Sequence, residues 1–152
     1  MASGDVVGLI HGLAPPAGSQ RASQATWTGG TTTDTGGAEN MPVLEFDDSQ
    51  DEYMDFICSL EGYGGGGVNV EFCWASDSQT TGNVEWNVAF RRLDDEGEDF
   101  NSTDHSYSYQ NTAEATAATA GQITYTPVAL SAGAQMDNVA DGERFIMRVY
   151  RD

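Results

Sequence analysis

The sequence predicts an all-β protein: an antiparallel, jelly-roll-like β-sandwich of seven to eight strands with an extended N-terminal arm. The first observation behind this prediction is the alternation of apolar and polar residues over residues 68–74 and 84–91, which is typical of strands with one buried face. The second is the recurrence of glycine- and serine-rich turns between such segments. Short strands at roughly even spacing are typical of sandwiches and jelly rolls.

The chain divides at about residue 40, into an arm and a sandwich domain of residues 41–152. Residues 1–40 hold a short apolar patch, a proline pair and a polar tract at 19–40 with one large residue, Trp27. Such a tract cannot by itself bury enough apolar surface to offset its ordering entropy. We therefore expect the arm to dock on a partner. The contact residues expected for this docking are Val6, Leu9, Ile10, Leu13 and Trp27.

Two alternatives for this segment stay open. A plain disordered terminus has the same composition. A first strand near residues 6–10 would instead make the apolar patch a part of the sheet.

The predicted strands of the sandwich follow one another from Met41 onward. Residues 111–120 are ambiguous, because alanine favours a helix whereas threonine favours a strand. Pro127 indicates a sheet edge or a bulge, and residues 135–141 a turn or a single helical turn. Apart from this ambiguous segment, the strands are expected at residues 42–46, 53–60, 68–75, 84–91, 107–110, 123–130 and 144–150, with Phe72, Trp74, Trp86 and Phe90 in the core and Arg144, Arg148 and Tyr150 on the opposite face of the last strand.

The two cysteines are expected to be free thiols that are mostly buried. If residues 53–60 and 68–75 form a hairpin, Cys58 falls opposite a residue near Val70, and Cys73 points to the other face of the sheet. One disulfide is the alternative, although a free cysteine commonly behaves as a small buried hydrophobe.

Charge limits the partners of this chain. It has no lysine, and six arginines stand against 24 aspartates and glutamates, for a formal charge of −18. Such a surface repels nucleic acid and anionic membranes, so we expect neither as a partner. The absence of lysine also excludes a P-loop lysine and Schiff-base chemistry.

Two acidic clusters, at residues 47–52 and 94–99, offer the oxygen ligands that calcium accepts. Neither follows the residue order of an EF-hand loop. Such clusters are expected on so acidic a chain without any metal. Solvated carboxylates are therefore the preferred interpretation, a divalent-cation site is the alternative, and no cofactor is expected.

Residues that carry catalysis are sparse. His11 lies in the arm and His105 in a polar loop, and together with Cys58 and Cys73 they show no zinc-ligand spacing. No Gly-x-Ser-x-Gly elbow frames a nucleophile. The glycines at 64–67 lack the lysine and the following helix of a phosphate-binding loop. The sequence thus predicts a protein that is not an enzyme.

A series of short motifs runs through residues 41–152 in a definite order and spacing. The motifs are Pro42-Val43-Leu44-Glu45-Phe46-Asp47, Tyr63-Gly64-Gly65-Gly66-Gly67-Val68-Asn69-Val70, Phe72-Cys73-Trp74, Gly82-Asn83-Val84-Glu85-Trp86-Asn87-Val88, Gly121-Gln122-Ile123, Met136-Asp137, Ala140-Asp141-Gly142-Glu143 and Phe145-Ile146-Met147-Arg148-Val149-Tyr150-Arg151-Asp152. Each motif alone is weak. As a series they resemble a domain of structural proteins of tailed bacteriophages, especially marine ones.

The resemblance implies a non-enzymatic virion protein that decorates or cements the outer capsid surface after synthesis in the host cytoplasm. Its implied partners are the major capsid protein and neighbouring copies of itself, often as a homotrimer. The alternative is a tail or head fibre module that binds a host-surface glycan or receptor, with or without calcium, through exposed Tyr63, Tyr107 and Tyr109. Longer family members continue beyond the position of Asp152. We therefore expect the sheet either to lack one strand or to receive one from residues 1–40.

Overall fold

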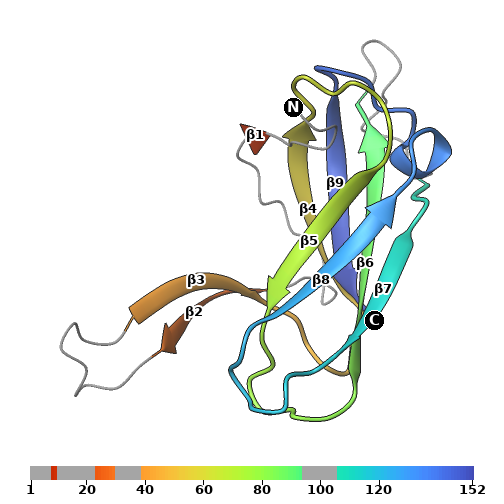
Figure 1. Ribbon diagram of the computed structural model, residues 1–152. Coiled ribbons are helices and arrows are strands. Elements are labelled where there is room, and N and C mark those ends of the chain that lie inside the picture. Colours follow the sequence, from red (N-terminus) through yellow and green to blue (C-terminus); the bar gives the residue numbers. More distant parts are fainter. Residues whose placement is uncertain (1–7, 10–22, 30–38, 94–105) are drawn as a thin grey trace.

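Nine β-strands and one short 3-10 helix make up the described part of the chain (Figure 1). The computed structural model describes residues 8–9, 23–29, 39–93 and 106–152, with side chains from Pro42 onward. The predicted all-β class is confirmed. The elements are β1 (Gly8–Leu9), β2 (Ser23–Gly29), β3 (Glu39–Glu45), β4 (Glu52–Ser59), β5 (Val68–Trp74), β6 (Asn83–Arg92), β7 (Gln110–Ala115), β8 (Thr124–Leu130), the 3-10 helix η1 (Ala134–Met136) and β9 (Arg144–Arg151).

The strands pair in a nested order that gives a β-sandwich. β4 pairs with β9, β5 with β8 and β6 with β7, all antiparallel, so early strands meet late ones as in a jelly roll. The larger sheet has the order β1-β4-β9-β6-β7, and β5 and β8 form a two-stranded sheet that crosses its face (Figure 1). A third pair, β2 and β3, forms a ribbon that extends away from the sandwich (Figure 1).

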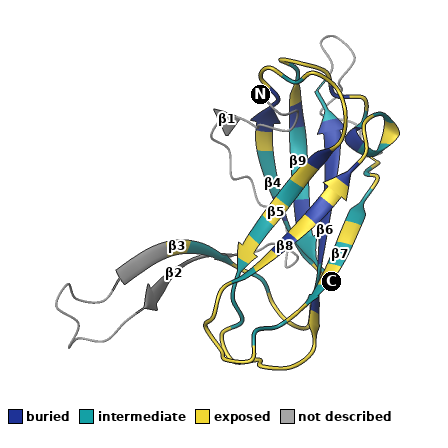
Figure 2. Ribbon diagram, viewed as in Figure 1, coloured by how far each residue is buried: buried dark blue, intermediate teal, exposed yellow. Residues whose placement is uncertain are grey.

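The core lies between the two sheets, because the inward-facing residues of the alternating strands are mostly apolar. Val88 and Phe90 of β6 are buried, as are Val128 and Leu130 of β8 and Phe145 of β9 (Figure 2). Burying each such side chain stabilises the fold by about 1.5–3 kcal/mol. The predicted core residues Trp86 and Phe90 are buried, and Phe72 and Trp74 pack against the same core while remaining partly exposed.

The expected hairpin between the strands at 53–60 and 68–75 is wrong, because these two strands lie in different sheets. The glycines between them carry the chain across the sandwich instead of reversing it within one sheet. Gly67 reaches β8 so closely that an added Cβ would lie 2.7 Å from the carbonyl oxygen of Leu130. Only glycine permits this approach without a shift of the backbone.

Three segments that the sequence left open or assigned to the arm contain strands in the structure. The ambiguous tract at 111–120 forms a strand only over β7, in register with β6. A strand near residues 6–10 is present as β1, which pairs with the end of β4. β2 lies within the tract that the sequence suggested as a polar tether, and the paired ribbon runs across residue 40. Among the described residues, no helix has the length and hydropathy needed to cross a bilayer.

Both cysteines are free, as expected, but only Cys58 is buried. Cys73 is exposed on the outward face of β5, opposite Tyr125 of β8. The expectation of two mostly buried thiols is therefore wrong for Cys73. The cause is the pairing of β5 with β8, which leaves the outward face of this small sheet uncovered.

Candidate functional site

The outer face of the larger sheet, opposite the core, gathers the aromatic and cationic side chains. Cross-strand register places Tyr53 and Asp55 of β4 directly opposite Tyr150 and Arg148 of β9. The alternation of β9 predicted that Arg148 and Tyr150 face away from the core, and the structure confirms it. Asp55 and Tyr53 were not predicted here, because sequence alternation alone does not reveal which strands are neighbours.

Four tyrosines form a continuous row across this face, named here the tyrosine row: Tyr53, Tyr150, Tyr109 and Tyr107. The ring centroids of Tyr53 and Tyr150 lie 4.8 Å apart, and Tyr109 meets Tyr150 edge to face at 4.9 Å. Tyr107 stacks on Tyr109 at 5.9 Å. Such separations are those of favourable aromatic pairs, worth about 0.5–1.5 kcal/mol each.

Ala89 explains how the row crosses β6. The pairing of Val88 with Gln110 puts Tyr109 beside Ala89 when the register is continued by one residue. Ala89 is completely buried although it belongs to the outer face. A small side chain at this position leaves room for the rings of Tyr107 and Tyr109 to reach β9.

Arg148 lies at the centre of the tyrosine row. Its guanidinium carbon is 4.2 Å from the ring centroid of Tyr107 and 5.8 Å from that of Tyr53. The same guanidinium donates hydrogen bonds from Nε and Nη2 to the two carboxylate oxygens of Asp55, both at 2.7 Å. Hydrogen bonding to Asp55 raises the pKa of Arg148 further above its ordinary value, so the guanidinium stays protonated.

Burial keeps the tyrosine hydroxyls protonated. It raises the pKa of Tyr109 to about 12 and raises the pKa values of Tyr53, Tyr107 and Tyr150 above their ordinary value. At neutral pH this surface therefore offers neutral hydroxyls, aromatic edges and one fixed ion pair. Tyrosine and arginine supply much of the binding energy of protein interfaces, so this surface suits protein recognition better than proton transfer.

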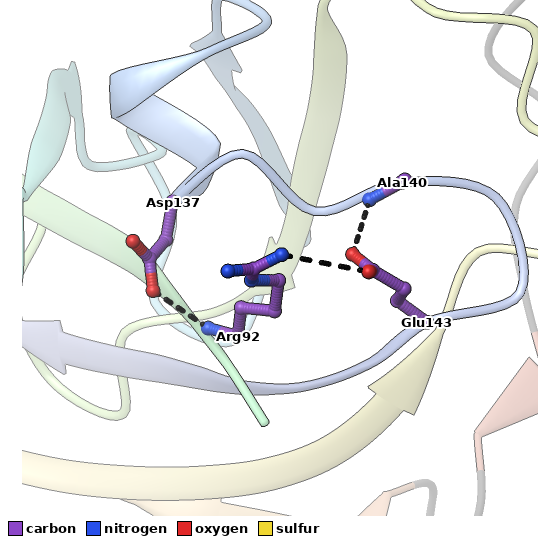
Figure 3. Close-up of polar contacts among 4 residues, drawn as sticks. All are labelled: Arg92, Asp137, Ala140 and Glu143. Carbon is purple, nitrogen blue, oxygen red and sulfur yellow. Dashed lines mark hydrogen bonds and ion pairs between the residues drawn. The ribbon is translucent and has the colours of Figure 1, made fainter. Parts of the chain in front are cut away.

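A second cluster fastens the end of β6 to the turn before β9 (Figure 3). The backbone N–H of Arg92 donates to Asp137 Oδ2 at 2.8 Å. The side chain of Arg92 forms an ion pair with Glu143, with Nη1 3.5 Å from Oε1. Glu143 Oε2 accepts from the N–H of Ala140 at 2.8 Å. Asp137 itself has a left-handed backbone, with φ of 49°. These contacts order a turn, and their groups satisfy one another.

The base of the β2–β3 ribbon is held to the sandwich by several contacts. The ring of Phe46 meets Trp86 edge to face at 5.1 Å, and Leu44 packs against the core. Arg151 Nη1 donates to the carbonyl of Asp47, whose N–H donates to Glu52 Oε2 at 2.7 Å. The ribbon therefore leaves the sandwich from a defined anchor.

The structure describes two of the five predicted contact residues of the arm. Val6, Ile10 and Leu13 lie outside the described residues. Leu9 belongs to β1, where it pairs with Cys58. Trp27 belongs to β2, in register with Met41. Their role in docking stays a prediction.

The first of the two predicted acidic clusters lies within the described residues. In the first cluster, Asp47 Oδ1 accepts from the N–H of Ser49 at 2.7 Å, and hydrogen bonds from Ser49 lower the pKa of Asp47. No group of three His, Cys, Asp or Glu side chains within the described ranges is arranged to hold a metal ion. The cluster at 94–99, His11 and His105 lie outside those ranges.

The tyrosines expected to be exposed are already engaged. Tyr63 is partly buried against the core; its hydroxyl donates to the carbonyl of Gly66, and its N–H donates to Asp141 Oδ1 at 2.8 Å. Tyr107 and Tyr109 belong to the tyrosine row and are half-buried. The expectation of three freely exposed rings is therefore wrong. Their contacts come from strand pairing and the chain crossing, which periodicity does not reveal.

Comparison with protein-family models, with curated proteins and with solved structures found no match for this chain.

Proposed function

We propose that this protein is a non-enzymatic structural component of a virion that binds the outer capsid surface as a decoration or cement protein. Its partners are the major capsid protein and neighbouring copies of itself, arranged as a homotrimer. The resemblance of residues 41–152 to structural domains of tailed bacteriophages suggests the virion. The observation that carries the mode of attachment is the β2–β3 ribbon, which projects from an anchored base (Figure 1).

The ribbon supports attachment for an energetic reason. An isolated two-stranded hairpin is marginally stable in water, because it lacks a second layer against which to bury one face. β2 and β3 pair only with each other among the described strands. A surface that covers the ribbon would stabilise both partners. Under this proposal that surface is the capsid.

The strong negative charge fits the same role. A formal charge of −18 keeps copies that are not attached apart. Attachment would then depend on weakly charged elements. Within β2 and β3 the only charged residues are Glu39 and Glu45.

The test is quantitative mass spectrometry of intact particles and of tail-free heads, with the major capsid protein as the reference. Hundreds of copies retained on heads are expected. A few dozen copies lost with the tail would favour the fibre alternative, and absence from particles would refute a virion role. In a binding assay on particles stripped of the protein, deletion of residues 1–40 should abolish attachment. This deletion keeps Leu44 and Phe46, which anchor the ribbon base. Tyr125→Ser, on the exposed face of β8, is the matched control and should attach normally.

The fibre alternative, with glycan or receptor binding, has less support. The rings proposed for sugar stacking are engaged by Arg148, Tyr150 and the Gly66 carbonyl. Its calcium-assisted form predicts a melting temperature that rises with millimolar calcium and falls with chelator. A flat response to both would refute that form.

A further inference from the structure

The sandwich is closed along one side and open along the other. On the closed side β7 and β8 run close together, although they belong to different sheets. On the opposite side β4 and β5 do not run close together in this way (Figure 1). β4 pairs with β9 in the larger sheet, and β5 pairs with β8 in the smaller one. Of the described segments, only β1 pairs with the outer edge of β4, and it covers the last two residues of that strand.

The core is correspondingly less well covered on the open side. The inward residues of β6 and β8 are buried, including Trp86, Val88, Val128 and Leu130. Among the inward residues of β5, Val68 is buried, whereas Val70, Phe72 and Trp74 are only partly buried although they pack against the same core. On β4, Phe56 is also partly buried, between the buried Met54 and Cys58. After its first residue, β5 is therefore intermediate or exposed along its length (Figure 2).

β5 itself has the properties of an acceptor strand. It pairs with β8 over seven consecutive positions without a bulge, and its other edge has no strand partner among the described residues. It contains no proline, and its one charged residue is Glu71, on the outward face. Natural proteins protect free edges with charges, prolines or bulges, and an unprotected edge readily pairs with another strand.

Charge decides which kind of strand would fit. A second copy is disfavoured at this edge, because each copy carries a formal charge of −18 and five of its six arginines belong to β6 and β9, which are already paired inside the larger sheet. A strand that carries a basic residue near Glu71 would gain a cross-strand ion pair. The apolar residues of the same strand, on its other face, would cover Val70 and Phe72.

We propose that the free edge of β5 accepts an extended segment of a different protein, by strand addition. The segment alternates apolar residues, which face the core, with basic residues, which face outward beside Glu71. Main-chain hydrogen bonds would give affinity, and the two faces would give specificity. The C-terminal half of β5 lies near the ribbon base, because Phe72 and Phe46 both pack on Trp86. The proposal concerns the edge of β5 alone and does not depend on a virion role.

The probe is a synthetic peptide, Lys-Val-Lys-Val-Lys-Val-Lys-Val, added to the full-length protein. Amide hydrogen exchange, read by NMR for each residue, reports which edge it occupies. Protection confined to β5, with little change along β7, is expected. The control peptide Lys-Lys-Lys-Lys-Val-Val-Val-Val has the same composition and charge but no alternation, and it should leave the exchange of β5 unchanged.

Two variants separate edge recognition from general attraction to an acidic protein. Glu71→Gln should weaken binding of the alternating peptide about two- to fivefold, as expected for loss of one cross-strand ion pair. Glu114→Gln removes the same charge from β7 and should leave the affinity unchanged. Circular dichroism confirms that each variant is folded.

Three results would overturn the proposal. The first is equal protection of β5 by both peptides, which would indicate only electrostatic adsorption. The second is protection at β4 or β7 instead of β5. The third is concentration-dependent protection of β5 without any peptide, which would identify a second copy as the occupant. Failure of the peptide experiment would leave particle attachment by the ribbon intact, because the ribbon deletion tests that separately.

Discussion

Arg148 and Asp55 face each other across β9 and β4 and share two parallel hydrogen bonds of 2.7 Å. This bidentate geometry fixes the guanidinium plane as well as its position. The plane then lies against Tyr107, 4.2 Å from its ring centroid. One ion pair thereby joins two strands and orients the tyrosine row above them.

Asp55→Asn should therefore destabilise the protein. The substitution removes the negative charge and one of the two acceptor oxygens, which leaves Arg148 incompletely paired beside three tyrosines. Hydrogen bonds to charged groups contribute about 1.5–3 kcal/mol, and partial exposure of both side chains lowers the expected loss to about 1–2 kcal/mol. Urea denaturation measures it. Asp48→Asn, at an exposed position, is the control and should change the stability by less than about 0.5 kcal/mol.

Tyr107→Leu should cost about 1–2 kcal/mol, because it removes the stacking on Arg148 and on Tyr109 together. Tyr107→Phe keeps the ring and should retain most of this stability. Thermal unfolding monitored by far-ultraviolet circular dichroism compares the two. Equal losses in both variants would mean that the hydroxyl, and not the ring, holds this segment.

Stability should fall in strongly alkaline solution. Burial raises the pKa of Tyr109 to about 12, above the ordinary value near 10. The folded protein therefore keeps a proton that the unfolded chain loses, so stability present below pH 10 is lost as the pH rises towards 12. Melting temperatures between pH 8 and pH 11.5 should show this decline. Tyr109→Phe should make the decline shallower without removing it, because burial also raises the pKa values of other tyrosines and of Cys58. An unchanged slope in that variant would contradict the assignment.

The two thiols should react at very different rates. Cys73 is exposed, whereas Cys58 is buried and burial raises its pKa to about 11. Because the thiolate is the reactive form, a chromogenic disulfide reagent should modify one thiol per native chain rapidly and the second only after unfolding. Cys73→Ser should abolish the rapid phase. Two rapid equivalents in the wild-type protein would show that the core opens near Cys58.

Gly67→Ala should destabilise the protein by about 1–3 kcal/mol, because the new methyl group would lie 2.7 Å from the Leu130 carbonyl oxygen and force β5 and β8 to adjust. Gly64→Ala is the matched control. An added Cβ at Gly64 meets nothing within 4 Å, and its backbone is not in the left-handed region. Chemical denaturation of the two variants should therefore give clearly different midpoints. Equal midpoints would place the close approach elsewhere in the crossing.

Alternation in the sequence determined the strands and their faces. The pattern of β6 and β9 placed Trp86 and Phe90 in the core and Arg148 and Tyr150 on the opposite face, and the structure agrees. This succeeds because the strand period of two depends only on local backbone geometry, and one face of each sheet is buried. Composition determined the strong negative charge, and the series of alternating segments separated by turns predicted the all-β class.

Pairing between distant strands was decided only by the tertiary structure. Nothing local states that β4 pairs with β9 and not with β5, because many pairings bury the same alternating residues. That pairing produces the ion pair between Asp55 and Arg148, the tyrosine row over Ala89 and the open edge of β5. The sequence alone therefore predicted which residues of each strand face the core. Only the tertiary structure determined which strands and edges are neighbours, because burial of the whole core selects one arrangement among many.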